Sequence, residues 1–250
     1  MLGATGDAAQ EETAVDLGLT DRVAVVAASS RGLGRASAEA LAAEGAHVVV
    51  NGRDQDRLER FVAAHPGSVA VAGDLADPHL PQRLVDAAME RWGRVDVVVG
   101  NNGGPPAVEA LDATDAQVLA AVDANLLSSV RLARAAVPHM REAGWGRICL
   151  IASSSVRQPI RDLALSNVAR TGLWAWAKTA AHDLAADGIT VNLACPGLHA
   201  TDRLAGRSIT GPVGDPADFG RVVAFLCSEP AAFVNGIAMG VDGGSVVGLL

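Results

Sequence analysis

The sequence predicts an α/β fold in which a doubly wound parallel sheet of about seven strands is flanked by helices within a single domain. The first observation is length: 250 residues, of which 50% are hydrophobic, suffice for one large domain with a substantial core. The second is a regular alternation, from Asp21 onward, of short β-branched runs with longer Ala-rich segments. The third is that no repeat, low-complexity tract or linker divides the sequence.

Seven nearly continuous apolar runs are the expected strands, because parallel strands are buried on both faces. They are residues 23–28, 47–51, 68–72, 95–100, 147–152, 190–195 and 236–241. The expected helices are residues 33–44, 54–64, 78–92, 113–141, 163–187 and 216–228. Right-handed crossovers place the ligand crevice at the carboxyl ends of such strands. Residues 1–20 are acidic and polar, unlike a secretory signal, and are expected to form a flexible arm before a folded domain of residues 21–250.

Composition argues against several classes of function. The net charge of −8 disfavours a broad nucleic-acid surface, and no apolar run reaches the length that spans a membrane. Cys149, Cys195 and Cys227 are widely spaced among apolar residues, which is typical of reduced core thiols in a cytoplasmic protein. The histidines show no ligand spacing, so no metal site is expected.

The first expected strand runs into the glycine-rich segment AASSRGLG, residues 27–34. Gly32 and Gly34 allow a tight turn, and the helix that follows directs its free N–H groups and its dipole at the turn, which favours an anionic pyrophosphate. Strand, glycine turn, helix and second strand come in the order of a Rossmann-type dinucleotide site. Ala28 stands where a first glycine is usual, which has little steric consequence if its backbone angles are ordinary.

Two arginines indicate which dinucleotide is bound. Gly52 holds the position where an NAD-binding protein usually has Asp or Glu, Arg53 follows it directly, and Arg31 lies in the glycine loop. Two guanidinium groups without a carboxylate favour a 2′-phosphate, so NADPH is expected rather than NADH. The alternative is that both arginines are solvated surface side chains.

A series of motifs in this order resembles the short-chain dehydrogenase/reductase family from Asp21 to Leu250. Besides the glycine loop, the matching segments are GDL at 73–75, NNGG at 101–104, DANLL at 123–127, IASSS at 151–155, ITVNLACPG at 189–197 and VDGG at 241–244. The resemblance implies an enzyme for a small-molecule substrate and a homo-oligomer, either a dimer or a homotetramer. Within the family, the segment from IASSS onward looks like a divergent β-ketoacyl reductase-like branch.

The resemblance also implies a set of cofactor-binding residues at the carboxyl ends of the strands. Asp74 and Leu75 would flank the adenine, and Pro196, Gly197 and Thr201 would line the nicotinamide. The full set is Ala28, Ser30, Arg31, Gly32, Leu33, Gly34, Asn51, Arg53, Asp74, Leu75, Asn101, Gly103, Arg170, Pro196, Gly197 and Thr201.

The catalytic residues that the resemblance implies are incomplete. Asn125 would hold a water through its helix carbonyl, and Ser153 would donate its hydroxyl to the substrate carbonyl. Where the family has tyrosine and lysine, this chain has Ser166 and Arg170, and it contains no tyrosine at all. A serine hydroxyl is a far weaker acid than a phenol, and an arginine stays protonated, so it can bind the nicotinamide ribose but cannot shuttle protons as lysine does.

His199 is the candidate replacement acid, because it follows the sixth strand and an imidazole exchanges protons near neutral pH. The alternative is a loop histidine that faces solvent. Water or an acidic group of the substrate could also supply the proton. The sequence thus predicts an NADPH-dependent reductase of an activated carbonyl, with a polyketide-like or aromatic substrate. A non-redox enzyme of the same fold, such as a cyclase, dehydratase or isomerase, is the alternative function.

Overall fold

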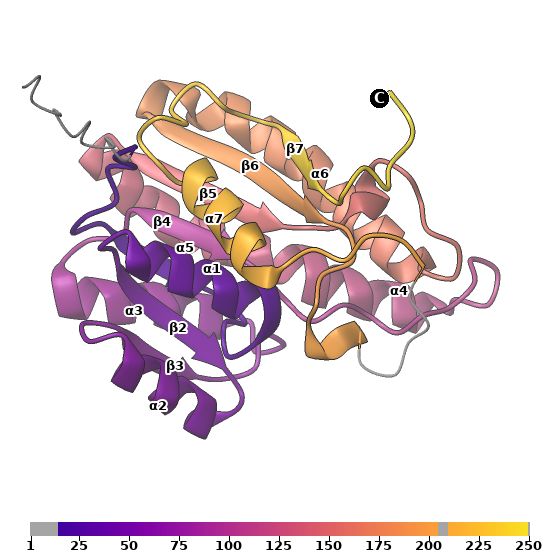
Figure 1. The fold of residues 1–250 in the computed structure, drawn as a ribbon, viewed down its shortest axis with the longest axis horizontal. Helices are drawn as coiled ribbons and strands as arrows, with labels where there is room; N and C mark the ends of the chain where they lie inside the picture. The colour runs from indigo at the N-terminus through magenta and orange to yellow at the C-terminus, as the bar shows by residue number, and fades with distance from the viewer. Residues whose placement is uncertain (1–14, 205–209, 250) are drawn as a thin grey trace, which may run out of the picture.

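The computed structural model describes residues 15–204 and 210–249, and over these ranges seven parallel strands form one sheet between two layers of helices (Figure 1). The strand order is β3-β2-β1-β4-β5-β6-β7. The strands are β1 (Val23–Val26), β2 (His47–Gly52), β3 (Val69–Ala72), β4 (Val97–Gly100), β5 (Gly146–Ile151), β6 (Ile189–Pro196) and β7 (Ala238–Val241). The predicted doubly wound Rossmann-type sheet is confirmed.

Seven α-helices within the described ranges cover the two faces of the sheet. They are α1 (Gly32–Ala43), α2 (Gln55–Ala64), α3 (Leu80–Trp92), α4 (Asp115–Val122), α5 (Ser128–Ala143), α6 (Ala164–Leu184) and α7 (Pro216–Leu226). The sequence predicts one helix over residues 113–141, but a π-helical turn at Asp123–Leu127 separates α4 from α5. A capping box between Thr114 and Gln117 begins α4.

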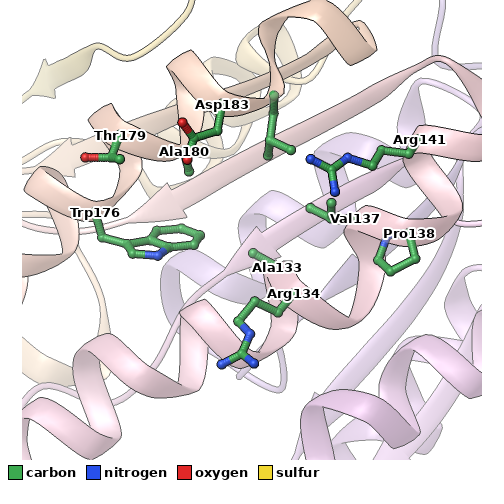
Figure 2. Close-up of a pocket in the computed structure, with 10 residues that line it drawn as sticks. Ala133, Arg134, Val137, Pro138, Arg141, Trp176, Thr179, Ala180 and Asp183 are labelled. Atoms are coloured by element: carbon green, nitrogen blue, oxygen red, sulfur yellow. The ribbon is translucent and has the colours of Figure 1, made fainter.

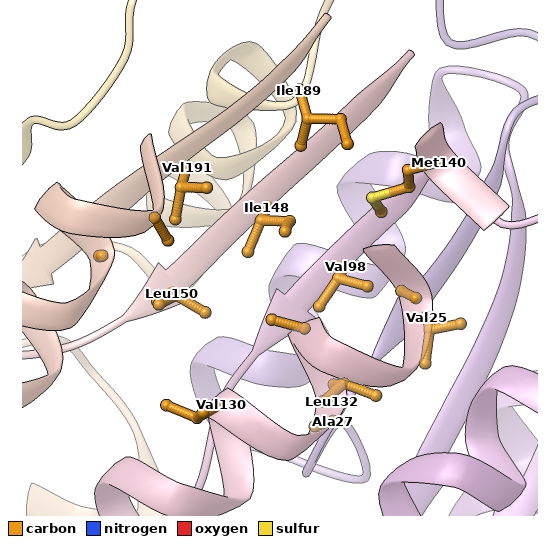
Figure 3. Close-up of a cluster of buried hydrophobic side chains, with 14 of the residues drawn as sticks. Val25, Ala27, Val98, Val130, Leu132, Met140, Ile148, Leu150, Ile189 and Val191 are labelled. Atoms are coloured by element: carbon orange, nitrogen blue, oxygen red, sulfur yellow. The ribbon is translucent and has the colours of Figure 1, made fainter. Parts of the chain in front are cut away.

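Each strand contributes alternate side chains to two separate cores, as expected of a sheet buried on both faces. Val25, Val98, Ile148 and Val191 pack against α3, α5 and α6 in the first core (Figure 3). Their neighbours along the strands, among them Ala24, pack on the other face against α1, α2 and α7. The many valines suit strands, since a β-branched side chain has a restricted χ1 that fits the pleated surface.

The strand order places the reversal point of the sheet between β1 and β4. From β1 the chain adds β2 and β3 on one side, then crosses back to β4 and continues to β7 on the other. In sheets of this kind ligands bind at the carboxyl ends of the strands beside that point. The segments after β1, β4, β5 and β6 therefore form the crevice.

The folded domain begins before the predicted boundary at residue 21. Residues 1–14 of the expected arm lie outside the described residues, but Leu19 is 1% exposed and belongs to the second core. The carbonyl of Leu17 accepts a hydrogen bond from the Glu229 N–H at 2.9 Å. Among the described residues, none of the helices combines the length and the apolar character that crossing a bilayer requires.

Candidate active site

The glycine loop between β1 and α1 contains two residues in the left-handed region of backbone conformation. Gly32 has φ 58° and Ala28 has φ 46°. An L-residue in this region brings its Cβ close to the following carbonyl, at a cost of about 1–2 kcal/mol, whereas glycine has no Cβ. The condition under which Ala28 would have little steric consequence, ordinary backbone angles, is therefore not met, and the fold favours glycine at this position.

Two asparagines, one in β2 and one directly after β4, hold Ala28 in place. The Asn51 side chain accepts from the Ala28 N–H at 3.2 Å, and the Asn101 side chain donates to the Ala28 carbonyl at 3.1 Å. The Asn51 amide also donates to the carbonyls of Val71 and Gly73, and Asn51 is 1% exposed. Asn51 therefore positions the glycine loop from beneath. Because Asn51 is buried, the predicted direct contact of its side chain with a cofactor does not fit the structure.

The amino end of α1 fits a pyrophosphate. Arg31 precedes the helix in an extended conformation, and within the described residues its side chain forms no capping hydrogen bond. The described first turn of α1 contains no acidic residue, so its free N–H groups and the helix dipole favour an anion. A Cβ on Gly34 would lie 2.5 Å from the Ala28 carbonyl oxygen, so only glycine allows this approach. Ser30 and Leu33 lie in the same loop and are partly exposed.

The carboxyl end of β2 favours a phosphate over ribose hydroxyls. A Cβ on Gly52 would lie 2.6 Å from the Ser30 Oγ, so an acidic side chain has no room there. The Arg53 side chain is 74% exposed and pairs with Asp74 at 3.4 Å, and the Arg31 side chain is 61% exposed. Exposed ion pairs of this kind are weak, so both guanidinium groups can turn to a phosphate. These residues therefore fit the 2′-phosphate of NADPH.

The segment after β6 reaches across to the glycine loop. The Gly197 N–H donates to the Val241 carbonyl at 3.0 Å, and a Cβ on Gly197 would lie 2.8 Å from the Asp242 Cα. Pro196, the last residue of β6, is partly exposed, and the Thr201 Cγ2 lies 3.7 Å from the Cβ position of Gly32. The predicted nicotinamide-side residues therefore lie in one segment at the crevice.

Two further residues predicted to bind the cofactor, Leu75 and Gly103, differ in their surroundings. Leu75 is partly buried, and its side chain packs against the first core. Gly103, in the segment after β4, has no described atom within 4 Å of its Cβ position, so it leaves open space.

Ser153 places a hydroxyl directly after β5. The Ser153 Oγ accepts from the Ser155 N–H at 3.1 Å, which fixes the oxygen. Because that bond uses an acceptor position, the hydroxyl hydrogen can still be donated to a ligand. Ser153 is partly exposed, whereas Ser155 is 0% exposed. The position therefore suits a donor that polarises a carbonyl.

Arg170 lies beneath this site with its guanidinium bound to the protein. Nη1 donates to the carbonyls of Ile151 and Ala152, each at 2.9 Å, and Nη2 donates to the Asn102 side chain at 3.1 Å. Arg170 is 5% exposed. Burial, with a smaller contribution from the charge of Arg203, lowers the pKa of Arg170 to about 10, so the group stays charged at neutral pH. The fork predicted to bind a ribose is occupied by internal contacts.

Asn125 and Asn102 meet at the same guanidinium. The Asn125 Oδ1 lies 3.5 Å from the Arg170 Nη2, and Asn125 is in the π-helical turn, where it is 1% exposed. Asn102 was not among the predicted site residues, although the NNGG segment that contains it was. The Asn102 Nδ2 is buried and has no hydrogen-bond partner among the described residues. Sequence reasoning missed Asn102 because its partner Arg170 departs from the family pattern.

Ser166 is on α6, one turn before Arg170, and is 5% exposed. The helix packs against β6 and against the short turn Ser154–Val156, which brings Ser166 to the carboxyl end of β5. A serine reaches much less far than a tyrosine, so at this depth its hydroxyl is a poor substitute for a phenol.

His199 was the candidate replacement acid in the crevice, with a solvent-facing histidine as the alternative. The structure agrees with neither position. The imidazole is 6% exposed and packs edge-on against Phe219 of α7, with 5.2 Å between the ring centroids. Its Nδ1 lies 3.3 Å from the Gly197 carbonyl. Phe219 belongs to the second core, whereas α6 covers the first core, so the ring and Arg170 lie towards opposite faces of the sheet. This position favours a structural role over that of an acid.

Two hollows lie away from these residues. One, of about 330 Å³, is between α5 and α6 and is lined by Trp176 and Asp183 on one helix and by Arg134 and Arg141 on the other (Figure 2). The second, of about 370 Å³, lies between residues 109–110 and 159–167. Neither is lined by a predicted site residue. Among the described residues, no cluster of three or more His, Cys, Asp or Glu could hold a metal ion.

Comparison with known proteins agrees with this geometry. The family described as enoyl-(acyl carrier protein) reductase matches residues 27–246. Dehydrogenase/reductase SDR family member 4 from Oryctolagus cuniculus is 33% identical over 248 residues, which cover 91% of this chain and 94% of that protein. L-rhamnose 1-dehydrogenase (NAD(P)(+)) from Azotobacter vinelandii is 34% identical over 254 residues, with 92% and 99% covered.

Among solved structures, L-sorbose reductase from Gluconobacter frateurii, complexed with NADPH and L-sorbose, has a TM-score of 0.88 and 30% identity. That match covers 94% of this chain and 100% of the reductase. The glycine loop, the seven-stranded parallel sheet and the extent of these matches lead to one assignment. The chain belongs to the short-chain dehydrogenase/reductase family.

Proposed function

We propose that the protein is an NADPH-dependent reductase of an activated carbonyl, with a polyketide-like or aromatic substrate. One observation carries the proposal: the same edge of the sheet has a glycine loop that fits a dinucleotide and, at the end of β5, the fixed Ser153 hydroxyl. Arg31 and Arg53 support NADPH over NADH, because both guanidinium groups are exposed beside a Gly52 that leaves no room for a carboxylate. When bound, NADPH supplies hydride to an electrophilic carbon.

Ser153 is the residue that we assign to the substrate carbonyl. Its oxygen is held by the Ser155 N–H, so the donor is set in place before the substrate arrives. A preorganised donor of this kind stabilises the negative charge that develops on a carbonyl oxygen, and its removal typically costs about 10²–10³ in rate.

Arg170 is the positioning residue beneath the site. It joins the end of β5 to the segment after β4 through Ile151, Ala152 and Asn102. Its pKa of about 10, lowered chiefly by burial, keeps a positive charge under the crevice at neutral pH. We infer that it supports the geometry and the electrostatics of the site, and that it passes no proton.

The missing tyrosine limits the substrates. Positioned acid catalysis contributes about 10²–10⁴-fold, whereas correct orientation can contribute about 10⁵–10⁸ M of effective molarity. A site that keeps orientation and loses the acid can therefore still reduce a carbonyl that is already electron-poor. The proton comes from water or from an acidic group of the substrate, since Ser166 is too short and too weak an acid to donate it.

The test is an assay of NADPH oxidation with a panel of quinones, β-diketones and β-ketothioesters, and with unactivated ketones as the control set. The proposal predicts turnover of at least one activated class and none of the plain ketones. NADPH binding without oxidation on any compound would instead favour the non-redox alternative of a cyclase, dehydratase or isomerase. The absence of any NADPH binding would contradict both functions.

We also propose that the protein forms a homodimer or homotetramer through α5 and α6. The hollow between these helices carries Trp176 together with both acidic and basic side chains, Asp183, Arg134 and Arg141 (Figure 2). Such a mixed surface around an aromatic side chain suits a contact with a second copy. Sedimentation equilibrium tests the proposal, because a species at the chain mass of 25.4 kDa would contradict it.

A further inference from the structure

A short turn after β6 lies across the dinucleotide-binding edge of the sheet. Asp202–Leu204 forms this turn, and Thr201 precedes it with its Cγ2 at 3.7 Å from the Cβ position of Gly32. A Cβ on Gly104 would overlap the guanidinium of Arg203. The turn therefore lies against both the glycine loop and the segment after β4.

Asp202 places a carboxylate between two arginines at this edge. Its Oδ2 is 3.9 Å from the Arg31 Nη1 and 3.8 Å from the Arg57 Nη1. Arg31 belongs to the glycine loop, whereas Arg57 lies in the first turn of α2, directly after β2. Arg57 also pairs with Asp54, the N-cap of α2, at 3.0 Å. One oxygen anion thus lies between guanidinium groups that come from the ends of two neighbouring strands.

We propose that Arg31 and Arg57 together bind a phosphate group of the cofactor. Until the cofactor binds, the carboxylate of Asp202 forms ion pairs with both arginines in place of that phosphate. This inference rests on the proposed function. It adds Arg57 as a phosphate-binding residue and makes Asp202 a residue that sets cofactor affinity.

The energies favour exchange of the carboxylate for a phosphate. The side chains of Asp202, Arg31 and Arg57 are 68%, 61% and 39% exposed, so each of these long ion pairs contributes little. A phosphate carries more charge than a carboxylate and accepts two parallel hydrogen bonds from one guanidinium. If Asp202 stayed beside the phosphate, the two anions would repel each other. Cofactor binding must therefore move the turn away from the two arginines.

The experiment is a calorimetric titration of the full-length protein with NADPH, NADH and adenosine 2′,5′-bisphosphate. Asp202→Asn should tighten binding about 3- to 10-fold, because it removes the competing charge without shortening the side chain. Arg57→Ala should weaken binding by at least about 5-fold. The matched controls are Asp187→Asn, which removes an ion pair of 2.7 Å at the opposite edge of the sheet, and Arg60→Ala, which removes an exposed arginine of α2 one turn after Arg57. Both variants should leave every affinity unchanged.

The three ligands distinguish which phosphate is bound. Effects confined to NADPH and the bisphosphate indicate the 2′-phosphate, whereas equal effects on NADH indicate the pyrophosphate, and either result supports the inference. Unchanged affinities in Asp202→Asn and Arg57→Ala, with folding checked by thermal melting, would overturn it while leaving the proposed function intact. If the wild-type protein binds none of the three ligands, the proposed function itself fails.

Discussion

Ser153 and Ser155 are two serines in one turn with different surroundings, and their comparison tests the site at the scale of single residues. Ser153→Ala should lower the rate constant for carbonyl reduction about 10²–10³-fold, with little change in NADPH affinity, because it removes the donor to the carbonyl oxygen. Steady-state kinetics together with a cofactor titration measures both quantities.

Ser155→Ala is the matched control. The Ser155 Oγ is buried without a partner among the described residues, and the N–H that fixes Ser153 is kept in alanine. This variant should retain the wild-type rate. Equal losses in the two variants would show that the turn, and not the Ser153 hydroxyl, is what matters.

Ala28 gives a second prediction at this scale. Ala28→Gly removes the strain of an alanine at φ 46°, but it also adds conformational entropy to the unfolded chain. Since the left-handed strain of about 1–2 kcal/mol exceeds the entropic cost of about 0.5–1 kcal/mol, the variant should be more stable by about 0.5 kcal/mol. Denaturant unfolding measures the change.

The control for Ala28 is its neighbour Ala27, which is 2% exposed in the first core. Ala27→Gly should destabilise the protein by about 1 kcal/mol, because no left-handed strain offsets the entropy there. The same loss in both variants would contradict the account of Ala28.

Single residues also mark the limit of prediction from sequence. The turn at Gly32 and Gly34 was predictable because the φ of Gly32 and the close approach at Gly34 depend on local backbone. His199 was not, since Phe219 of α7 buries it from a distant part of the chain. Arg170 was placed correctly on its helix. Three of its four partners among the described residues come from the ends of other strands and the fourth, Asn125, from the π-helical turn, and no local pattern specifies them.

At the scale of elements, the strands were predictable and one helix was not. Successive side chains of each strand are buried on opposite faces of the sheet, so a strand must be apolar along its whole length, and such runs are visible in the sequence. The helix expected at 113–141 is interrupted, because the π-helical turn lets Asn125 meet Arg170 of α6. The start of α4 did have a local signal, since Thr114 and Gln117 are spaced as a capping box.

The amino edge of the sheet depends on one buried carboxylate. Asp96 is 1% exposed and accepts hydrogen bonds from the Val23 N–H and from the guanidinium groups of Arg22 and Arg94. Asp96→Asn should lower the free energy of unfolding by about 3 kcal/mol, since it removes the buried negative charge that accepts charge-assisted hydrogen bonds from two partly exposed arginines. Thermal melting should show a midpoint about 6–12 °C lower.

Activity at low temperature should persist in Asp96→Asn, because the edge lies opposite the crevice. Asp218→Asn removes an exposed pair with Arg221 and should cost about 1 kcal/mol or less. Similar losses in the two variants would contradict the role of burial.

At the scale of the whole molecule, the buried thiols predict how the protein responds to alkali. Cys149, Cys195 and Cys227 are all buried and free. Burial raises the pKa of Cys195 from an ordinary value of 9.0 to about 12. Only about 10⁻⁴ of this thiol is ionised at pH 8, so the folded protein should resist alkylation there, and denaturant should expose all three thiols.

The same shift predicts the direction of the change in stability. A folded pKa above the unfolded value means that the contribution to stability is complete below pH 9 and is lost as the pH rises towards 12. The free energy of unfolding should therefore fall by about 1.4 kcal/mol per pH unit from Cys195 alone above pH 9. Urea unfolding at pH 8, 9 and 10 checks this, and a flat profile in wild type and Cys195→Ala alike would contradict it.

The net charge of −8 describes the molecule as a whole, yet the edge of the sheet beside the glycine loop carries Arg31, Arg53 and Arg57. The first two are expected to bind phosphate from their places beside the glycine loop and β2. Arg57 could not be identified in this way, because its partner Asp202 lies 145 positions later in the chain and only the fold brings the two together.

Hydride transfer to carbon without a tyrosine is the central claim, and isotope transfer tests it most directly. The protein should be incubated with NADPH deuterated at C4 and a reactive β-diketone, and the alcohol product analysed by mass spectrometry. The account predicts one deuterium on the new carbinol carbon and loss of that product in Ser153→Ala. Bound NADPH that is never consumed, with product absent or free of deuterium, would contradict it.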